Sequence, residues 1–149
     1  MRPTARRLVS VAGLLFVVWS LGTVVCVAAG WPAQFGGPGN PNKVAREFLS
    51  RGTVLSPPLW VMVGLVVFAL LVRSRRRWGT LGAVGLCLLA ALTFVGSMGE
   101  ALAPATPHVP RAVLVLSGVL GVVLCPALLY FGIAEVRARV LARRQTSRV

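Results

Sequence analysis

The sequence has no aspartate and very few acidic residues of any kind. Its 149 residues include three acidic residues, one histidine and one tyrosine. Charged residues make up 13% of the chain, against roughly 25% in a typical soluble domain. The absence of aspartate excludes a Ser-His-Asp triad and an aspartate-dependent phosphotransfer site. The chain also lacks a glycine-rich phosphate-binding loop that ends in lysine.

The remaining reactive side chains do not form a catalytic pattern. Cys26, Cys87 and Cys125 each lie alone in a different apolar segment, so the chain has no Cys-x-x-Cys pair. We expect Cys87 and Cys125 to lie at similar depth, and we interpret both as packing residues. His108 has no neighbouring carboxylate or thiol, which argues against a metal site. We therefore predict no catalytic residue, no cofactor and no metal, and we predict that the protein is not an enzyme.

Formal charges are absent from four long stretches, residues 8–42, 52–72, 78–99 and 112–134. Each stretch contains an apolar run close to the roughly 20 residues that a helix needs to cross a bilayer. We predict an all-α integral membrane four-helix bundle that forms a single domain over residues 1–149. The expected spans are residues 8–29, 57–73, 78–99 and 112–134, followed by a basic tail over residues 135–149.

The first apolar run also resembles a secretory signal peptide. Three arginines precede it, and Val27, Ala28 and Ala29 resemble a cleavage site. The run is longer than the roughly 7–15 apolar residues of a signal peptide. We therefore predict a retained span, and cleavage remains the alternative. Cleavage would leave the orientation of the other three spans unchanged.

The basic residues are unevenly divided between the connections. Twelve lie in the N-terminus, the turn at residues 73–77 and the tail, whereas four lie in the other two connections. The positive-inside rule then predicts that both termini are cytoplasmic. Trp31 and Trp60 would mark the outer interface, and Trp78 and Tyr130 the inner one. Because arginine far outnumbers lysine, we expect a GC-rich bacterial genome. Together with the four expected spans, this predicts a multi-pass protein of the bacterial inner (cell) membrane.

The first outer connection contains one short amphipathic segment. Residues 43–51 are predicted to form an interfacial helix that Asn42 caps and Gly52 ends. Charged residues in and near this connection form a candidate outer-face polar cluster, consisting of Glu100, Arg46, Arg51 and Arg111.

On the opposite face, arginines are candidate contacts for anionic lipid headgroups. They occur in short patches beside apolar runs, a placement that favours lipid over nucleic acid. These candidate contacts are Arg73, Arg75, Arg76, Arg77, Arg137, Arg139, Arg143 and Arg144.

Small residues recur at close spacing in the third expected span. Gly79, Gly82 and Gly85 would let helix backbones approach closely. We favour packing within one chain over a homodimer. Pro126 is expected to kink the fourth span because it removes a helical hydrogen bond.

The leading functional hypothesis is a non-enzymatic accessory or structural protein that interacts with lipid or another membrane protein. The alternative is a small transporter or channel subunit with an outer vestibule under the 43–51 helix. Such a pathway would need polar residues from several spans in one cavity. The candidates are Ser20, Thr23, Thr93 and Ser117.

Overall fold

The computed structural model describes residues 2–34, 36–37, 39–74 and 77–146, and it is all-α and 78% helical. The predicted fold class is confirmed at this level. The helical elements are, in chain order, α1 (Pro3–Ala29), η1 (Pro41–Lys43), α2 (Val44–Glu47), α3 (Leu59–Val72), α4 (Arg77–Leu102) and α5 (Arg111–Thr146).

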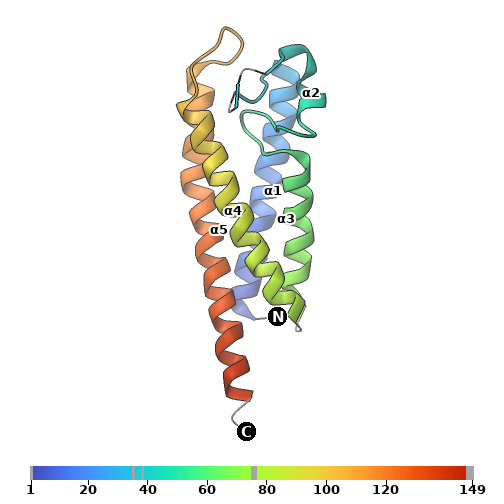
Figure 1. The fold of residues 1–149 in the computed structure, drawn as a ribbon, viewed down its shortest axis with the longest axis vertical. Helices are drawn as coiled ribbons and strands as arrows, with labels where there is room; N and C mark the ends of the chain where they lie inside the picture. Colours follow the sequence, from blue (N-terminus) through green and yellow to red (C-terminus); the bar gives the residue numbers. More distant parts are fainter. Residues whose placement is uncertain (1, 35, 38, 75–76, 147–149) are drawn as a thin grey trace.

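The four longer helices pack side by side along one axis (Figure 1). Helix α4 packs against both α3 and α5, and α1 also contacts α3 and α5. The start of α1, the α3–α4 turn and the end of α5 lie toward one end, which we name the terminal end (Figure 1). The described residues of the connection over residues 30–58, and the connection over residues 103–110, lie at the opposite end, which we name the loop end.

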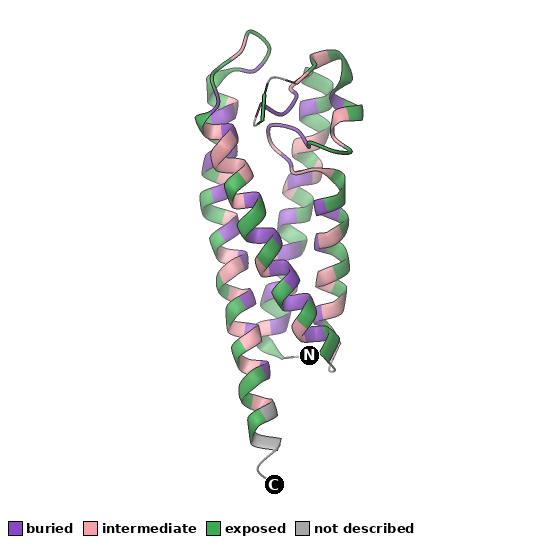
Figure 2. Cartoon of the chain, viewed as in Figure 1, coloured by how far each residue is buried: buried purple, intermediate pink, exposed green. Residues whose placement is uncertain are grey.

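Leucine side chains from every long helix meet in the core. Leu15 of α1, Leu65 of α3, Leu86 of α4 and Leu128 of α5 are each at most 1% exposed. Trp19 joins the same core cluster, so this mid-helix tryptophan packs within the protein. Figure 2 shows the buried residues along the inward sides of the helices. Van der Waals contacts among these buried apolar side chains hold the helices side by side.

The outward sides of the helices are also strongly apolar. Among the described residues, α1, α4 and the Arg111–Ala142 part of α5 are long and apolar enough to cross a membrane, whereas α3 is a shorter apolar helix. Large exposed apolar side chains occur on all four, including Leu21, Leu70, Leu88 and Val123. The exposed apolar area is much larger than that of soluble proteins, in which exposed apolar residues are usually scattered singly.

Glycines of α4 allow a close contact between α3 and α4. A Cβ atom on Gly82 would lie 2.7 Å from the Phe68 carbonyl oxygen, and one on Gly85 would lie 2.5 Å from the Phe68 ring. Both glycines are buried. The spacing predicted from the sequence therefore serves packing within the chain at this position.

The segment predicted as a helix over residues 43–51 is shorter and begins earlier. A 3-10 turn (η1) precedes the four-residue α2, and Phe48 to Arg51 follow as turns. The capping residue is Asn40, whose Oδ1 accepts the Asn42 N–H at 2.9 Å. The prediction of Asn42 as the cap was thus wrong, because the helical segment begins at Pro41, two residues before the predicted start. Gly52 was predicted to end the helix, but α2 already ends at Glu47, and Gly52, with φ +85°, follows the turns after it.

All four long helices differ in length from the expected spans. Helix α1 begins earlier, at Pro3, and α4 ends later, at Leu102. Helix α5 continues through Pro126 to Thr146, so it includes most of the predicted tail. Helix α3 has 14 residues, and at about 1.5 Å per residue it is about 21 Å long. Pro57 and Pro58 have no N–H to donate, and the chain turns helical only after them. The shortness of α3 shapes the loop end.

Candidate functional site

The chain fills the space beyond α3 with an irregular segment, residues 52–58, which we name the loop-end segment. The Thr53 N–H donates to the Ser56 carbonyl at 2.9 Å, and the Ser56 N–H donates back to the Thr53 carbonyl at 3.3 Å. Gly52 must be glycine, because its φ is positive and a Cβ would lie 2.5 Å from the Ser56 carbonyl oxygen. The segment therefore closes its own backbone hydrogen bonds, as buried backbone must.

Helix α1 holds the loop-end segment in place. The Thr23 hydroxyl donates to Ser56 Oγ at 2.8 Å and also lies 2.9 Å from the Trp19 carbonyl. Leu55 packs against Gly22, where a Cβ would lie 3.0 Å from the Leu55 Cβ. A hydroxyl pair between Thr53 and Ser56, 2.8 Å apart, completes the network.

A cavity of about 200 Å³ lies beside this segment, and we name it the loop-end cavity. Residues of α1, α3, α4, α5 and the loop-end segment line it. Its wall is mostly apolar, with Trp19, Trp60 and Leu92 among the lining residues. Its polar side chains are Arg51, Ser56, Thr93, Ser97, Glu100 and Ser117. A concave site with an apolar wall and a few convergent polar groups is the usual form of a ligand pocket.

Glu100 is the buried carboxylate of this cavity. The residue is 6% exposed, and its Oε1 and Oε2 accept the Gln34 backbone N–H at 3.0 and 2.9 Å. The Gln34 side chain donates to the Pro32 carbonyl at 2.9 Å, which fixes the segment after α1. Gly30 begins this segment with φ +68°, ending α1 in a left-handed turn. Glu100 is therefore held inside the protein instead of lying at its surface.

The other residues of the predicted outer-face cluster lie in different surroundings. Arg51 lines the loop-end cavity with Glu100, and its Nη2 donates to the Gly37 carbonyl at 2.6 Å. Arg111 donates to the Ala103 carbonyl at 2.7 Å across the α4–α5 connection. Arg46 is exposed on α2. The structure thus brings Arg51 and Glu100 to one cavity, which Arg46 and Arg111 do not line.

The pathway residues predicted from the sequence are also divided. Thr93 and Ser117 line the loop-end cavity, and Thr23 supports the loop-end segment beside it. Ser20 donates to the Phe16 carbonyl of its own helix at 2.7 Å. The alternative hypothesis placed a vestibule under the 43–51 helix. Of that segment only Arg51 lines the cavity, together with the loop-end segment, and no residue of α2 does.

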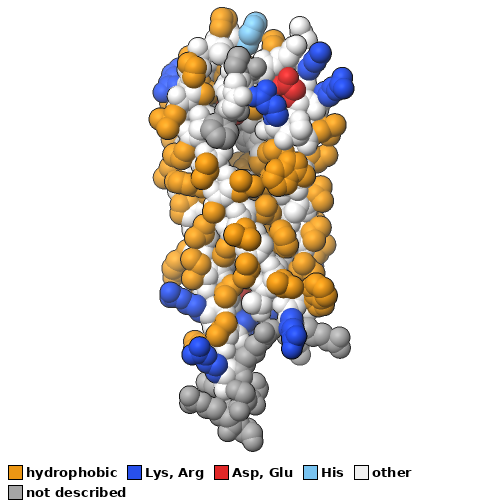
Figure 3. Space-filling model, in the orientation of Figure 1, with side chains coloured by type: hydrophobic (Ala, Val, Ile, Leu, Met, Phe, Trp, Pro, Cys, Tyr) orange, Lys and Arg blue, Asp and Glu red, His pale blue; other side chains and the backbone are white. Residues whose placement is uncertain are grey.

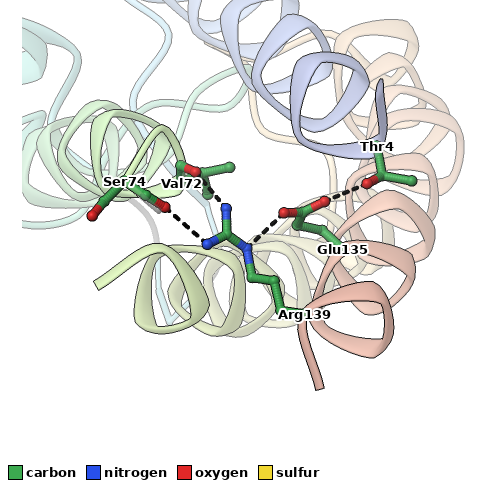
Figure 4. Close-up of polar contacts among 5 residues, drawn as sticks. All are labelled: Thr4, Val72, Ser74, Glu135 and Arg139. Carbon is green, nitrogen blue, oxygen red and sulfur yellow. Dashed lines mark hydrogen bonds and ion pairs between the residues drawn. The ribbon is translucent and has the colours of Figure 1, made fainter. Parts of the chain in front are cut away.

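A second buried polar cluster lies at the terminal end, and Figure 4 shows its contacts. Glu135 is fully buried, and its Oε1 pairs with Arg139 Nε at 2.6 Å. The Thr4 hydroxyl donates to the other carboxylate oxygen of Glu135. Arg139 also donates to the carbonyls of Val72, at 2.7 Å, and Ser74, at 2.9 Å. One ion pair thereby joins α1, α5 and the end of α3.

Arg139 therefore differs from the other predicted lipid contacts. Its guanidinium is buried against protein partners, although the sequence placed it among the candidates for lipid headgroups. Arg73, Arg77, Arg137 and Arg144 are exposed around the same end. Arg75 and Arg76, together with the side chain of Arg143, lie outside the described residues.

The cysteines have separate hydrogen-bonding partners. Cys125 Sγ lies 3.3 Å from the Thr93 hydroxyl, and Cys87 Sγ lies 4.0 Å from the Leu129 carbonyl. All three cysteines are free thiols. Within the described ranges, no three His, Cys, Asp or Glu side chains are grouped so that they could hold a metal ion.

Sequence reasoning missed the terminal-end cluster and the burial of Glu100. The four-residue spacing of Glu135 and Arg139 on one helix face is a signal that could have found the ion pair. No local signal identifies Glu100 as buried, since its partner Gln34 is 66 residues away. Comparison with known proteins adds no relative, because no family model, curated protein or solved structure matches the chain.

Proposed function

We propose that the chain is a four-span membrane protein in which α1, α3, α4 and α5 cross the bilayer. The observation that carries this proposal is the apolar outer surface of all four helices. Hydrophobic side chains form a broad belt, and lysine and arginine gather toward the two ends (Figure 3). On α5, about 36 Å separate Arg111 from Glu135 at about 1.5 Å per residue, slightly more than the roughly 30 Å hydrocarbon core.

The short helix α3 fits this proposal because the loop-end segment completes its span. Irregular backbone at membrane depth is tolerated where protein surrounds it and its hydrogen bonds are made. Thr53 and Ser56 make such bonds and are both buried.

The terminal end is proposed to face the cytoplasm of a bacterial cell, at the inner membrane. Twelve of the sixteen basic residues belong to this end by the sequence count, and cytoplasmic connections carry the excess of lysine and arginine. Exposed arginines such as Arg73 and Arg137 are then suited to anionic headgroups, each worth about 1 kcal/mol near the surface.

We propose a non-enzymatic accessory role, in which the protein binds lipid or another membrane protein. The described polar groups support binding more than chemistry. Glu135 is already paired with Arg139, and Glu100 accepts a backbone N–H. A partner protein or a second copy would cover part of the apolar belt.

A small transporter or channel subunit is the second candidate, and the loop-end cavity favours it. Thr93, Ser117 and Glu100 contribute polar groups from two helices to that cavity. Conduction would also require a path to the terminal end. The core below is filled by Leu15, Leu65 and other fully buried leucines, so the cavity supports binding from one side better than passage.

Two measurements on the full-length protein test the proposed function. Alkaline extraction of membranes should leave the protein in the pellet, and its recovery in the soluble fraction would contradict membrane integration. Purification in a mild detergent, followed by light scattering, should give a particle larger than one chain plus detergent and lipid. A clean monomer would count against an accessory role with a protein partner and leave lipid binding as the proposed role.

A further inference from the structure

The loop-end cavity has one feature that the accessory role does not use, namely a pair of opposite charges among the side chains that line it. Glu100 lines it as a buried carboxylate, and Arg51 lines it as an exposed guanidinium. A ligand with a single charge would be attracted by one of these groups and repelled by the other. A zwitterion can complement both.

The size of the cavity points to part of a larger molecule. Its volume of about 200 Å³ is below the roughly 300–1,000 Å³ of pockets that enclose a whole drug-sized ligand. Three of its lining side chains are at least half exposed at the lateral surface, namely Trp60, Leu92 and Val95. The remainder of the ligand would lie against these apolar side chains, which face the bilayer in the proposed membrane arrangement.

The depth of the polar groups matches a headgroup. Glu100 lies near the loop end of α4, and Thr93 lies about two helical turns deeper. Val95 lies between these two depths, whereas Leu92 lies one residue deeper than Thr93. A charged group near the loop end, with apolar side chains beneath it, matches the headgroup and acyl layers of a phospholipid.

We propose that this cavity binds the headgroup of a zwitterionic phospholipid with a primary ammonium group, such as phosphatidylethanolamine. Its ammonium would contact Glu100 and its phosphate would contact Arg51. A primary ammonium can donate hydrogen bonds to the carboxylate, which a quaternary ammonium cannot. The acyl chains would leave the cavity past Trp60 and Leu92. This inference rests on the proposed membrane location.

Native mass spectrometry of the full-length protein tests the inference. The detergent-purified protein is incubated separately with phosphatidylethanolamine, phosphatidylcholine and phosphatidylglycerol that carry identical acyl chains. We expect about tenfold more retained phosphatidylethanolamine than either other lipid, equivalent to about 1.4 kcal/mol. Equal retention of the three lipids, or preference for phosphatidylcholine or phosphatidylglycerol, would overturn the proposal.

Matched variants assign the binding to this cavity. Gly96 lines the cavity, and a Cβ there meets no atom within 4 Å, so Gly96→Leu should fill the cavity without a clash at the helix. We expect it to abolish the preference. Gly13→Leu is the control, because Gly13 also has open space around its Cβ but lines a different groove. Wild-type selectivity in Gly96→Leu, or its loss in Gly13→Leu, would contradict the assignment.

A second pair of variants tests the charge. Glu100→Gln keeps an acceptor for the Gln34 N–H and removes the negative charge, so selectivity for the primary ammonium should fall by about tenfold. Glu47→Gln is the control, since Glu47 also accepts a backbone N–H, from Asn40, without lining the cavity. Unchanged selectivity in Glu100→Gln would exclude the carboxylate as the ammonium site.

Failure of this inference is distinguishable from failure of the proposed function. Protein that resists alkaline extraction yet shows no lipid preference contradicts only the lipid site. Protein that leaves the membrane on alkaline extraction contradicts the membrane proposal, whatever lipids it retains in detergent.

Discussion

The two ends of the molecule each bury a carboxylate, and they stabilise it in different ways. At the terminal end, Glu135 meets Arg139 directly, and the pair also binds Thr4 and two backbone carbonyls. At the loop end, Glu100 accepts a backbone N–H from the segment after α1 and borders a cavity. The terminal end is closed by its own polar groups, whereas the loop end leaves room for a ligand. We therefore expect the terminal end to contribute more to stability, and we propose that the loop end binds a ligand.

Removing the guanidinium should cause the largest loss of stability. Arg139→Ala leaves the buried Glu135 carboxylate without its ion-pair partner, which should lower the free energy of unfolding by about 3–5 kcal/mol. Denaturant titration in detergent measures this loss. Arg137→Ala removes an exposed arginine from the same helical turn and should change the value by less than about 0.5 kcal/mol. Equal effects of the two variants would mean that the ion pair does not hold this end together.

Adding one methyl group at each end should give effects of opposite sign. A Cβ on Gly79 would overlap Arg139 and the Ser74 carbonyl, so Gly79→Ala should destabilise the protein by about 1–3 kcal/mol. Gly96→Ala places the same group in open space and should stabilise α4 by up to about 1 kcal/mol. The same titration measures both variants, and a similar loss at both positions would contradict the contrast in packing.

Neutralising the loop-end carboxylate should have a smaller effect on stability. Glu100→Gln retains an acceptor for Gln34 but weakens a charge-assisted hydrogen bond, at a cost of about 1 kcal/mol. Glu47→Gln, at a more exposed carboxylate, serves as the comparison in the same titration. A loss at Glu100 as large as that of Arg139→Ala would mean that the loop end is as tightly coupled to folding as the terminal end.

The smallest effect is expected between the two ends, where Thr93 of α4 meets Cys125 of α5. Thr93→Val removes the hydroxyl that lies 3.3 Å from Cys125 Sγ, and hydrogen bonds between membrane helices average about 0.6 kcal/mol. Ser20→Ala, which removes a bond within a single helix, is the control and should cost less. A larger loss for Ser20→Ala, again by denaturant titration, would argue against a stabilising α4–α5 bond.

Much of the helical framework was predictable because apolar runs and charges are local signals. The charge-free stretches correctly located α1, α3, α4 and α5, and the glycines of α4 correctly indicated close packing. The start of α1 at Pro3 was missed, because polar residues that precede an apolar run can remain helical when they bind as Thr4 does. The basic tail was expected to be able to continue as a helix, and α5 does extend to Thr146.

The cavity was less predictable because it depends on contacts between distant segments. Pro57 and Pro58 predicted where a helix would begin, but not that the preceding residues would fold back on Thr23. The sequence placed Glu100 beside Arg51, yet it gave no indication that Gln34 would bury the carboxylate. The spacing of Glu135 and Arg139 could have indicated their ion pair, but no local signal indicated that Arg139 would also bind carbonyls of α3 and the following turn.

The orientation of the two ends across a membrane underlies this account, and cysteine labelling in intact cells tests it most directly. The three native cysteines are replaced by alanine, and a single cysteine is placed at Asn42 or at Arg144, both exposed. A membrane-impermeant maleimide should label Asn42→Cys in intact cells and Arg144→Cys only after permeabilisation. Labelling of Arg144→Cys in intact cells, with Asn42→Cys protected until permeabilisation, would contradict the account.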